Sequence, residues 1–324
     1  MCIRDRSAPI GASTVSARWF IARRGRAIGV IFLWGAIGGL VFTVLSAEMI
    51  DHFGMKAAWI TIGLVVFGVS LAPCLFLVVE RPEDMGLLPD NATPAKDNGN
   101  RRRDSAKGVE LGDEDSWTLS EAMNSKVFWI LFFMGMAMFC VNTGTNVHIG
   151  AYYRDQGMTM TLAAIAISFS WIVSAIGSLA WGWVLEKIQA RWAYSMVFVI
   201  LGVSTLYLLA VDSTAGAFVA SGLIGCVSGG SNVVISILYA DYYGRNSLGR
   251  IRGVSETGVL IGQAVGPLLA GILFDTRGSY SFVFILFGGL ALVCSLIVLT
   301  AKPPARPVRT VSYTHLTLPT NREV

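Results

Sequence analysis

Charged side chains are scarce in this sequence. Asp, Glu, Lys and Arg make up 14% of its 324 residues, while 54% of the residues are hydrophobic. Soluble domains carry about 25% charged residues, so a soluble protein of this composition would lack an adequate polar surface. The composition therefore argues against a soluble protein and favours a chain whose apolar runs cross a lipid bilayer.

Paired cysteines and catalytic motifs are also missing. Of the five cysteines, four fall inside separate apolar runs, so they predict packing residues rather than a disulfide framework. The sequence shows no cleavable signal peptide. It has no His/Cys metal spacing, no phosphate-binding glycine loop with its lysine, and no nucleophile elbow. We therefore predict that the protein is not an enzyme and has no cofactor or metal site.

What the sequence does contain is eight long apolar runs bounded by charged or turn residues. They lie near residues 27–47, 58–79, 127–148, 160–184, 192–211, 216–240, 254–274 and 282–301. A membrane-spanning backbone must satisfy its own hydrogen bonds, and runs of about 20 residues are longer than barrel strands. The runs therefore predict an all-α polytopic membrane protein with eight transmembrane helices.

Lys and Arg are distributed unevenly between the two sets of loops. One set holds 22 of the 25, and the other holds Lys56, Arg154 and Arg277. Because cytoplasmic loops are enriched in Lys and Arg, we expect the richer side and both termini to be cytoplasmic. The basic charge then needs no nucleic-acid partner, and the expected partner is the bilayer.

Polar segments divide the chain. Residues 80–126 predict a cytoplasmic central loop, within which 116–125 form either a short amphipathic surface helix or an ordinary solvated linker. The loop separates two spans in 8–79 from six in 127–301, and 302–310 follow as a cytoplasmic tail. Residues 1–7 and 311–324 resemble translated adapter read-through and are expected to be foreign to the fold.

The chain also contains an internal repeat. Shifting it by 224 residues places span 27–47 on span 254–274, with ten identities between Gly25 and Gly54. The identical pairs include Gly25/Gly249, Arg26/Arg250, Asp51/Asp275 and Gly54/Gly278. A repeat six spans apart with the same orientation predicts a duplicated six-helix unit. We therefore expect two spans of a first unit and all six of a second.

Three stretches resemble the major facilitator superfamily, in its bacterial branch of monocarboxylate and oxalate-formate carriers. They are Arg18 to Gly29, Arg81 to Asp90, and Tyr243 to Asp275. The resemblance implies a twelve-helix fold of which the last eight helices are present, in a bacterial inner (plasma) membrane. It also implies secondary active transport, by alternating access, of a small organic solute such as a carboxylate, with a proton or counter-anion as coupling partner. The alternative is a non-transporting membrane sensor or scaffold with the same bundle.

The turn after span 160–184 is similar to the loop signature of this family. Gly182, Glu186, Lys187 and Arg191 match its spacing, and the family uses such charges to lock cytoplasmic helix ends. Simple solvation of a helix end is the alternative interpretation. The acidic residue and arginine that related carriers place in the eighth span are missing from 160–184, so no coupling pair is carried over from the family.

Uncharged polar side chains cluster on the spans that the resemblance assigns to a substrate cavity. They are Asn142, Thr145 and Asn146, then Ser228, Ser231 and Asn232, with Gln263 as a further candidate. Their i, i+3, i+4 spacing places each set on one helical face. Amides and hydroxyls can bind a carboxylate or hydroxyl group without burying a charge, although hydrogen bonding between helices is an alternative role.

Three ionisable residues are candidates for coupling or gating. His148 at the outer end of its span can titrate near neutral pH, and Arg154 can attract an anion. Glu256 lies within a span, where an acid is a functional candidate, and a structural clamp with Arg250 or Arg252 is the alternative. Ser170, Ser174 and Ser178, and the Gly-x-x-x-Gly pairs 35/39, 225/229 and 262/266, predict close helix packing.

Overall fold

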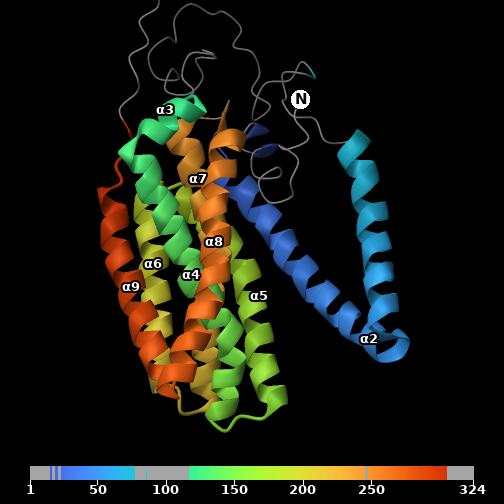
Figure 1. Ribbon diagram of the computed structural model, residues 1–324. Coiled ribbons are helices and arrows are strands. Elements are labelled where there is room, and N and C mark those ends of the chain that lie inside the picture. The colour runs from blue at the N-terminus through green and yellow to red at the C-terminus, as the bar shows by residue number, and fades with distance from the viewer. Residues whose placement is uncertain are drawn as a thin grey trace, which may run out of the picture.

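The computed structural model describes residues 15–16, 19–20, 23–76, 85, 117–244 and 247–304, with side chains omitted at 39–48, 50–51, 70–76 and 160. These residues are helical and contain no strand. Figure 1 shows a bundle of roughly parallel helices with a separate helical hairpin beside it. The fold is therefore the all-α polytopic fold that the sequence predicts.

The helices follow the predicted spans closely. They are α2 (Arg24–Phe76), α3 (Leu119–Asn124), α4 (Lys126–Asp155), α5 (Met160–Leu185), α6 (Ala190–Tyr207, continued by the 3₁₀ turn Leu208–Ala210), α7 (Thr214–Tyr243), α8 (Leu248–Arg277) and α9 (Ser281–Thr300). The short helix α3 lies within 116–125, the segment for which the sequence leaves a surface helix and a solvated linker as alternatives. A capping box stabilises its start, because Thr118 and Glu121 each satisfy a backbone N–H of the other.

The hairpin is helix α2, which bends sharply at Gly54. This glycine has φ 78°, and it joins a first arm (24–53) to a second arm (55–76). Its counterpart in the sequence repeat, Gly278, also has positive φ, at 67°, where α8 ends. Both positions require a backbone conformation that glycine adopts without a Cβ clash. The repeat thus coincides with a shared turn geometry.

Seven segments of the described chain are long and apolar enough to cross a membrane: His52–Val69, which includes the Gly54 bend and most of the second arm of α2, and one segment for each of α4 to α9. The first predicted span, 27–47, coincides with the first arm, but its residues 39–47 lie outside the described side chains. We call the end of the bundle that carries α3 the α3 end, and the opposite end the far end. Of the described Lys and Arg, those at the far end are Lys56, Arg154 and Arg277.

Close helix pairs build the bundle, with α4 against α8 and α5 against α7. A Cβ added at Gly262 or Gly266 of α8 would overlap a backbone carbonyl of α4, and one added at Gly225 or Gly229 of α7 would overlap one of α5. These two Gly-x-x-x-Gly pairs therefore pack closely as predicted. The prediction is wrong for Gly35, which borders open space.

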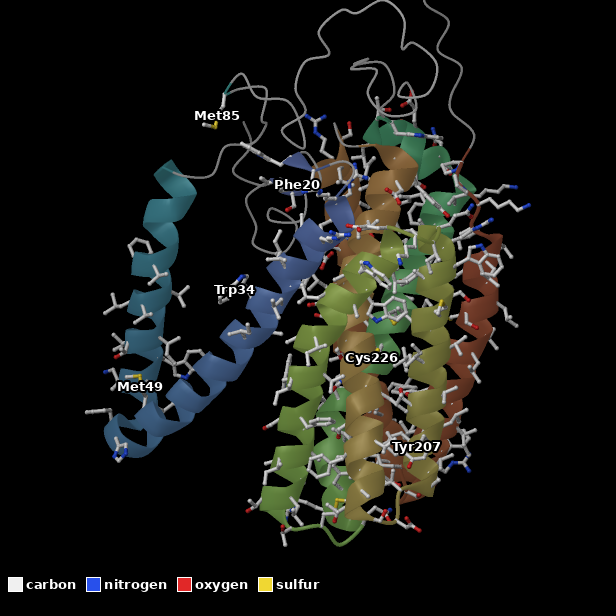
Figure 2. All side chains as sticks on the ribbon, turned by 180° about the vertical axis from the view of Figure 1, so that it is seen from behind. Phe20, Trp34, Met49, Met85, Tyr207 and Cys226 are labelled. Carbon is white, nitrogen blue, oxygen red and sulfur yellow. The ribbon has the colours of Figure 1, made fainter. Side chains whose placement is uncertain are left out.

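In the described part of the first arm of α2, the close contacts with the bundle lie near the α3 end. Gly25 packs against the backbone of Gly182, and Gly29 packs against that of Ser178. Farther along the arm, Gly38 has no neighbour within 4 Å among the described residues. Figure 2 shows that the arm diverges from the bundle as it approaches its turn, with Met49 near that turn. The arm and bundle thus form a wedge that opens toward the far end.

Candidate functional site

A cavity of about 360 Å³ lies in this wedge, between the first arm of α2 and the bundle. Its walls come from α2, α4, α5 and α7. The lining residues are Phe32, Gly35, Ala36, Asn142, Thr143, Asn146, Ser170, Trp171, Ser174, Ser178, Ser228, Gly229 and Asn232. None of these side chains is charged. The cavity therefore offers hydrogen-bonding groups and two aromatic rings to a ligand.

Asn142 organises the polar wall of the cavity. Its Oδ1 accepts a hydrogen bond from Asn146 Nδ2 at 2.8 Å and another from Ser228 Oγ at 3.3 Å. Asn146 Nδ2 also donates to the Asn142 carbonyl oxygen, one helical turn away, at 2.8 Å. Because the Asn142 side-chain oxygen accepts these two hydrogen bonds, its amide N–H groups point elsewhere and can donate to a ligand. The network joins α4 to α7 and fixes the orientation of the Asn142 side chain.

The structure brings four of the seven predicted cavity residues together: Asn142, Asn146, Ser228 and Asn232. The other three lie elsewhere. Thr145 is buried, with its hydroxyl unpartnered among the described residues, and Ser231 is buried and donates to the Ser228 carbonyl at 3.2 Å. Gln263 is half-buried on α8 and does not line the cavity.

Helix α5 contributes a cavity wall that the sequence analysis assigned to packing alone. Ser170, Ser174 and Ser178 do pack against other helices, because Ser170 and Ser174 contact Gly225 and Gly229 of α7 through their backbone. They also line the cavity, and Ser178 Oγ donates to the Gly29 carbonyl of α2 at 3.2 Å. A stripe of small polar residues suits both roles, so its spacing alone does not reveal the cavity.

His148 lies at the far end, outside the cavity. Its Nε2 is 3.0 Å from the Pro267 carbonyl of α8, and its Nδ1 is 3.2 Å from the Tyr280 hydroxyl. Burial, followed by the negative charges of Asp155 and Asp275, raises the pKa of Tyr280, so its phenol stays protonated and can donate to Nδ1. A neutral imidazole with its proton on Nε2 satisfies both contacts. His148 thus links α4, α8 and the start of α9.

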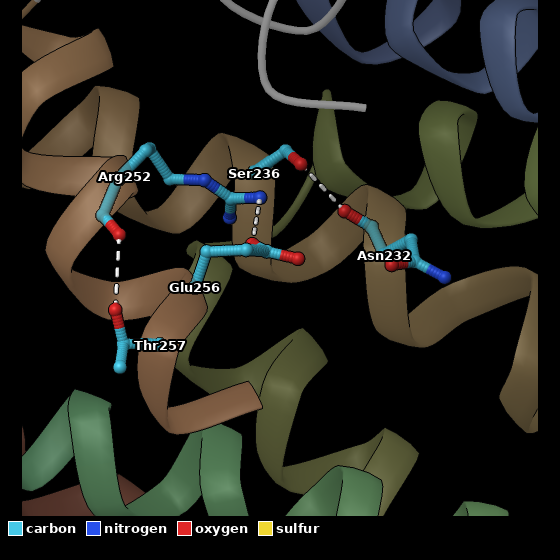
Figure 3. A network of polar contacts seen from close by, with 6 residues as sticks. Asn232, Ser236, Arg252, Glu256 and Thr257 are labelled. Carbon is cyan, nitrogen blue, oxygen red and sulfur yellow. Dashed lines mark hydrogen bonds and ion pairs between the residues drawn. The ribbon is translucent and has the colours of Figure 1, made fainter. Parts of the chain in front are cut away.

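The other two coupling or gating candidates also lie away from the cavity. Arg154 lines an open depression at the far end with Ala151, Asp155, Gly157 and Met158. Glu256 Oε2 is 3.4 Å from Arg252 Nη2, one turn earlier on α8. Figure 3 shows the two side chains facing each other. The clamp interpretation of Glu256 therefore matches the observed contact with Arg252.

The predicted loop signature lies at the point where α2 touches the bundle. Glu186 Oε2 is 2.9 Å from Arg26 Nη2, and a second pair joins Arg24 of α2 to Asp241 of α7, also at 2.9 Å. Gly182 provides the close backbone contact beside them. Lys187 lies over the Trp183 ring, and Arg191 donates to Gln189. Of the signature charges, Glu186 is thus the one that pairs with α2.

The family model for the Major Facilitator Superfamily matches this chain twice, over residues 7–253 and 165–320. The chain belongs to the Major Facilitator Superfamily. It is similar to monocarboxylate transporter 12 of Rattus norvegicus, at 22% identity over 92% of this chain and 64% of the relative. The chain thus spans less than two thirds of that relative's length.

Two further relatives show the range of this superfamily. Monocarboxylate transporter 12-B of Danio rerio is 23% identical over 87% of this chain and 61% of its own length. Membrane sensor protein UhpC of Escherichia coli strain K12 is 23% identical over 91% of this chain and 68% of its own length. The predicted resemblance is therefore confirmed for the superfamily and for its similarity to monocarboxylate transporters.

Proposed function

We propose that this chain is the larger part of a secondary transporter that moves a small organic solute, with organic carboxylates as the substrate class. The observation that carries the proposal is the polar cavity between α2 and the bundle of a superfamily member. A cavity between helical units near mid-membrane is where such transporters bind substrate. The names of the monocarboxylate transporter relatives support the substrate class.

The chemistry of the cavity wall suits a carboxylate or hydroxyl group. Asn142 and Asn232 carry amide N–H groups and Ser174 carries a hydroxyl, while the Asn146 amide and the Ser228 hydroxyl already donate to Asn142. Such groups bind an anion's oxygens without the cost of a charge inside the membrane. Among the described residues, the lining holds no basic side chain, so we expect the wall to orient the substrate while a proton or counter-anion couples its movement. Glu256, His148 and Arg154 lie outside the lining, and we propose no direct substrate contact for them.

Alternating access would involve the contact between α2 and the bundle. With the α3 end cytoplasmic in a bacterial inner membrane, as the Lys and Arg distribution predicts, the wedge opens outward. The pairs Arg26–Glu186 and Arg24–Asp241 would then hold the cytoplasmic side closed. We propose that these pairs separate when the cavity opens inward, which gives Glu186 the locking role that the loop signature predicts.

Uptake by the full-length parent protein tests the proposal. Membrane vesicles containing it are supplied with labelled short-chain carboxylates and, for comparison, neutral sugars. We expect accumulation of at least one carboxylate, which the double variant Asn142→Ala/Asn232→Ala abolishes because both amide donors are lost. Thr276→Ala, an exposed change at the far end, is the matched control and should leave uptake unchanged. No uptake across the panel would contradict transport and favour the sensor alternative.

A further inference from the structure

Unpartnered polar atoms are concentrated in the interior of the bundle near the α3 end. Five buried side-chain atoms there have no hydrogen-bond partner among the described residues. They are the hydroxyl oxygens of Tyr194, Tyr239 and Tyr243 and the Nε and Nη1 atoms of Arg252. Ser255 lies beside the Tyr239 hydroxyl and Ser125 lies beside that of Tyr243, but neither makes a hydrogen bond of normal length and angle with it. Buried polar groups are almost always paired with protein or with ordered water, so a cluster of five requires a physical cause.

The five atoms belong to one neighbourhood shared by three helices. The Tyr239 and Tyr243 rings of α7 stack with centroids 6.0 Å apart, and the Arg252 guanidinium of α8 lies 5.7 Å from the Tyr239 ring centre. Tyr194 of α6 lies within electrostatic range of both Tyr239 and Arg252. Trp117 covers the cluster at the α3 end by edge-on contact with Tyr243, at 5.6 Å between centroids.

The buried charge of Arg252 makes an interior without water energetically unfavourable at this place. Its side chain is only 5% exposed, and its one carboxylate partner, Glu256, meets a single nitrogen at 3.4 Å. A buried guanidinium needs acceptors for its remaining N–H groups, since an unpaired buried charge is strongly unfavourable. The nearby tyrosine hydroxyls do not lie within hydrogen-bond distance of it. Among the described residues, Nε and Nη1 of Arg252 thus have no acceptor, and a small molecule between the three helices would supply one.

We propose that Arg252, Tyr194, Tyr239 and Tyr243 enclose an internal binding site for water. Water can both donate and accept, which matches a set that combines N–H donors with hydroxyls of either role. Because a buried water makes about three hydrogen bonds, the five atoms call for about two molecules. Glu256, which faces Arg252 (Figure 3), has a side chain that is 21% exposed, so the cluster borders accessible surface on that side. The end of the bundle is thus hydrated around a charged residue, separately from the substrate cavity.

Radiolytic footprinting of the purified chain in nanodiscs tests the site directly. Hydroxyl radicals form from bound water, so they label side chains beside it even where bulk solvent has no access. Tyr194 and Tyr239 should be labelled more than Tyr153, an equally buried tyrosine whose hydroxyl is paired with Ala217 and Ser221. Labelling of Tyr194 and Tyr239 no greater than that of Tyr153 would overturn the proposal. The readout needs no transport, so it is independent of the proposed function.

Removing a tyrosine hydroxyl gives a second test, because a dry site and a hydrated site predict opposite changes in the Tm. If the site were dry, Tyr194→Phe and Tyr239→Phe would remove unpaired buried hydroxyls and raise the Tm. A hydrated site loses a water hydrogen bond instead, so we expect the Tm to fall by about 1–3 °C in each variant. Tyr153→Phe removes a hydroxyl with protein partners and gives the reference decrease. A rise in Tm for both test variants would contradict the water site.

Discussion

At the residue scale, the absence of a single Cβ decides how closely these helices approach. Gly262 and Gly266 let the backbone of α8 touch that of α4, while a Cβ at Gly289 of α9 would have no described residue within 4 Å. Between membrane helices, van der Waals packing replaces the hydrophobic drive that operates in water, so such contacts contribute much of the association energy. Glycines that look alike in the sequence thus have unequal structural importance.

We predict that Gly262→Ala destabilises the bundle. The new methyl group would overlap the Met136 carbonyl oxygen, and overpacking of this kind costs about 1–3 kcal/mol. Gly289→Ala is the matched control, because it adds the same methyl group in open space and improves helix propensity by about 0.5–1 kcal/mol. Thermal unfolding of the two variants in detergent checks this prediction. Equal Tm values would show that the contact between α4 and α8 is looser than the structure indicates.

At the element scale, α2 and the bundle are joined by a small contact flanked by two ion pairs. Arg26–Glu186 is partly exposed, and exposed pairs contribute about 0.2–1 kcal/mol each. Two such pairs hold the arm only weakly, which suits the opening proposed above. The glycine contacts at Gly25 and Gly29 provide shape, and the charges add a small, reversible stabilisation.

Neutralising both arginines of this contact is expected to loosen the arm. In a background without native cysteines, Ser178→Cys reports on docking, because Ser178 is buried against Gly29. Adding Arg24→Gln and Arg26→Gln should raise its maleimide reactivity about 2- to 30-fold, given about 0.4–2 kcal/mol for the two pairs. Arg23→Gln, at a neighbouring exposed arginine, should have little effect. Unchanged reactivity in the double variant would mean that the ion pairs do not hold the arm.

The helices could be predicted from sequence because long apolar runs between charges have few alternatives in a membrane. Their ends were less predictable: α4 continues to Asp155 and α8 starts at Leu248, since helical hydrogen bonding continues where hydropathy falls. Asn142 and Asn232 could be assigned to the cavity from their facing helices. Gln263 could not be excluded, because its position depends on how α8 rotates against α4. The tyrosines that surround Arg252 could not be predicted either, because they are brought together by tertiary packing.

At the scale of the whole molecule, the wedge between α2 and the bundle determines which side reaches the cavity. The two units touch at Gly25 and Gly29 near the α3 end, and they separate beyond Gly38. The repeat aligns this arm with α8 in the sequence, and the two aligned helices have positive-φ glycines at matching positions, Gly54 and Gly278. A rigid arm that pivots near its α3 end would change access at the far end most.

This geometry predicts one-sided access to the cavity. With the far end outside the cell, an impermeant thiol reagent added to intact cells should label Asn146→Cys, because Asn146 lines the cavity. Thr145→Cys is the matched control: it lies one position away, yet Thr145 is 1% exposed and should remain unlabelled. Equal labelling at both positions would contradict the cavity wall described here. Labelling of Asn146→Cys only after permeabilisation would instead show that the wedge opens toward the cytoplasm. In that case, either the membrane orientation is the reverse of the one expected, or the Arg26–Glu186 pair does not close the cytoplasmic side.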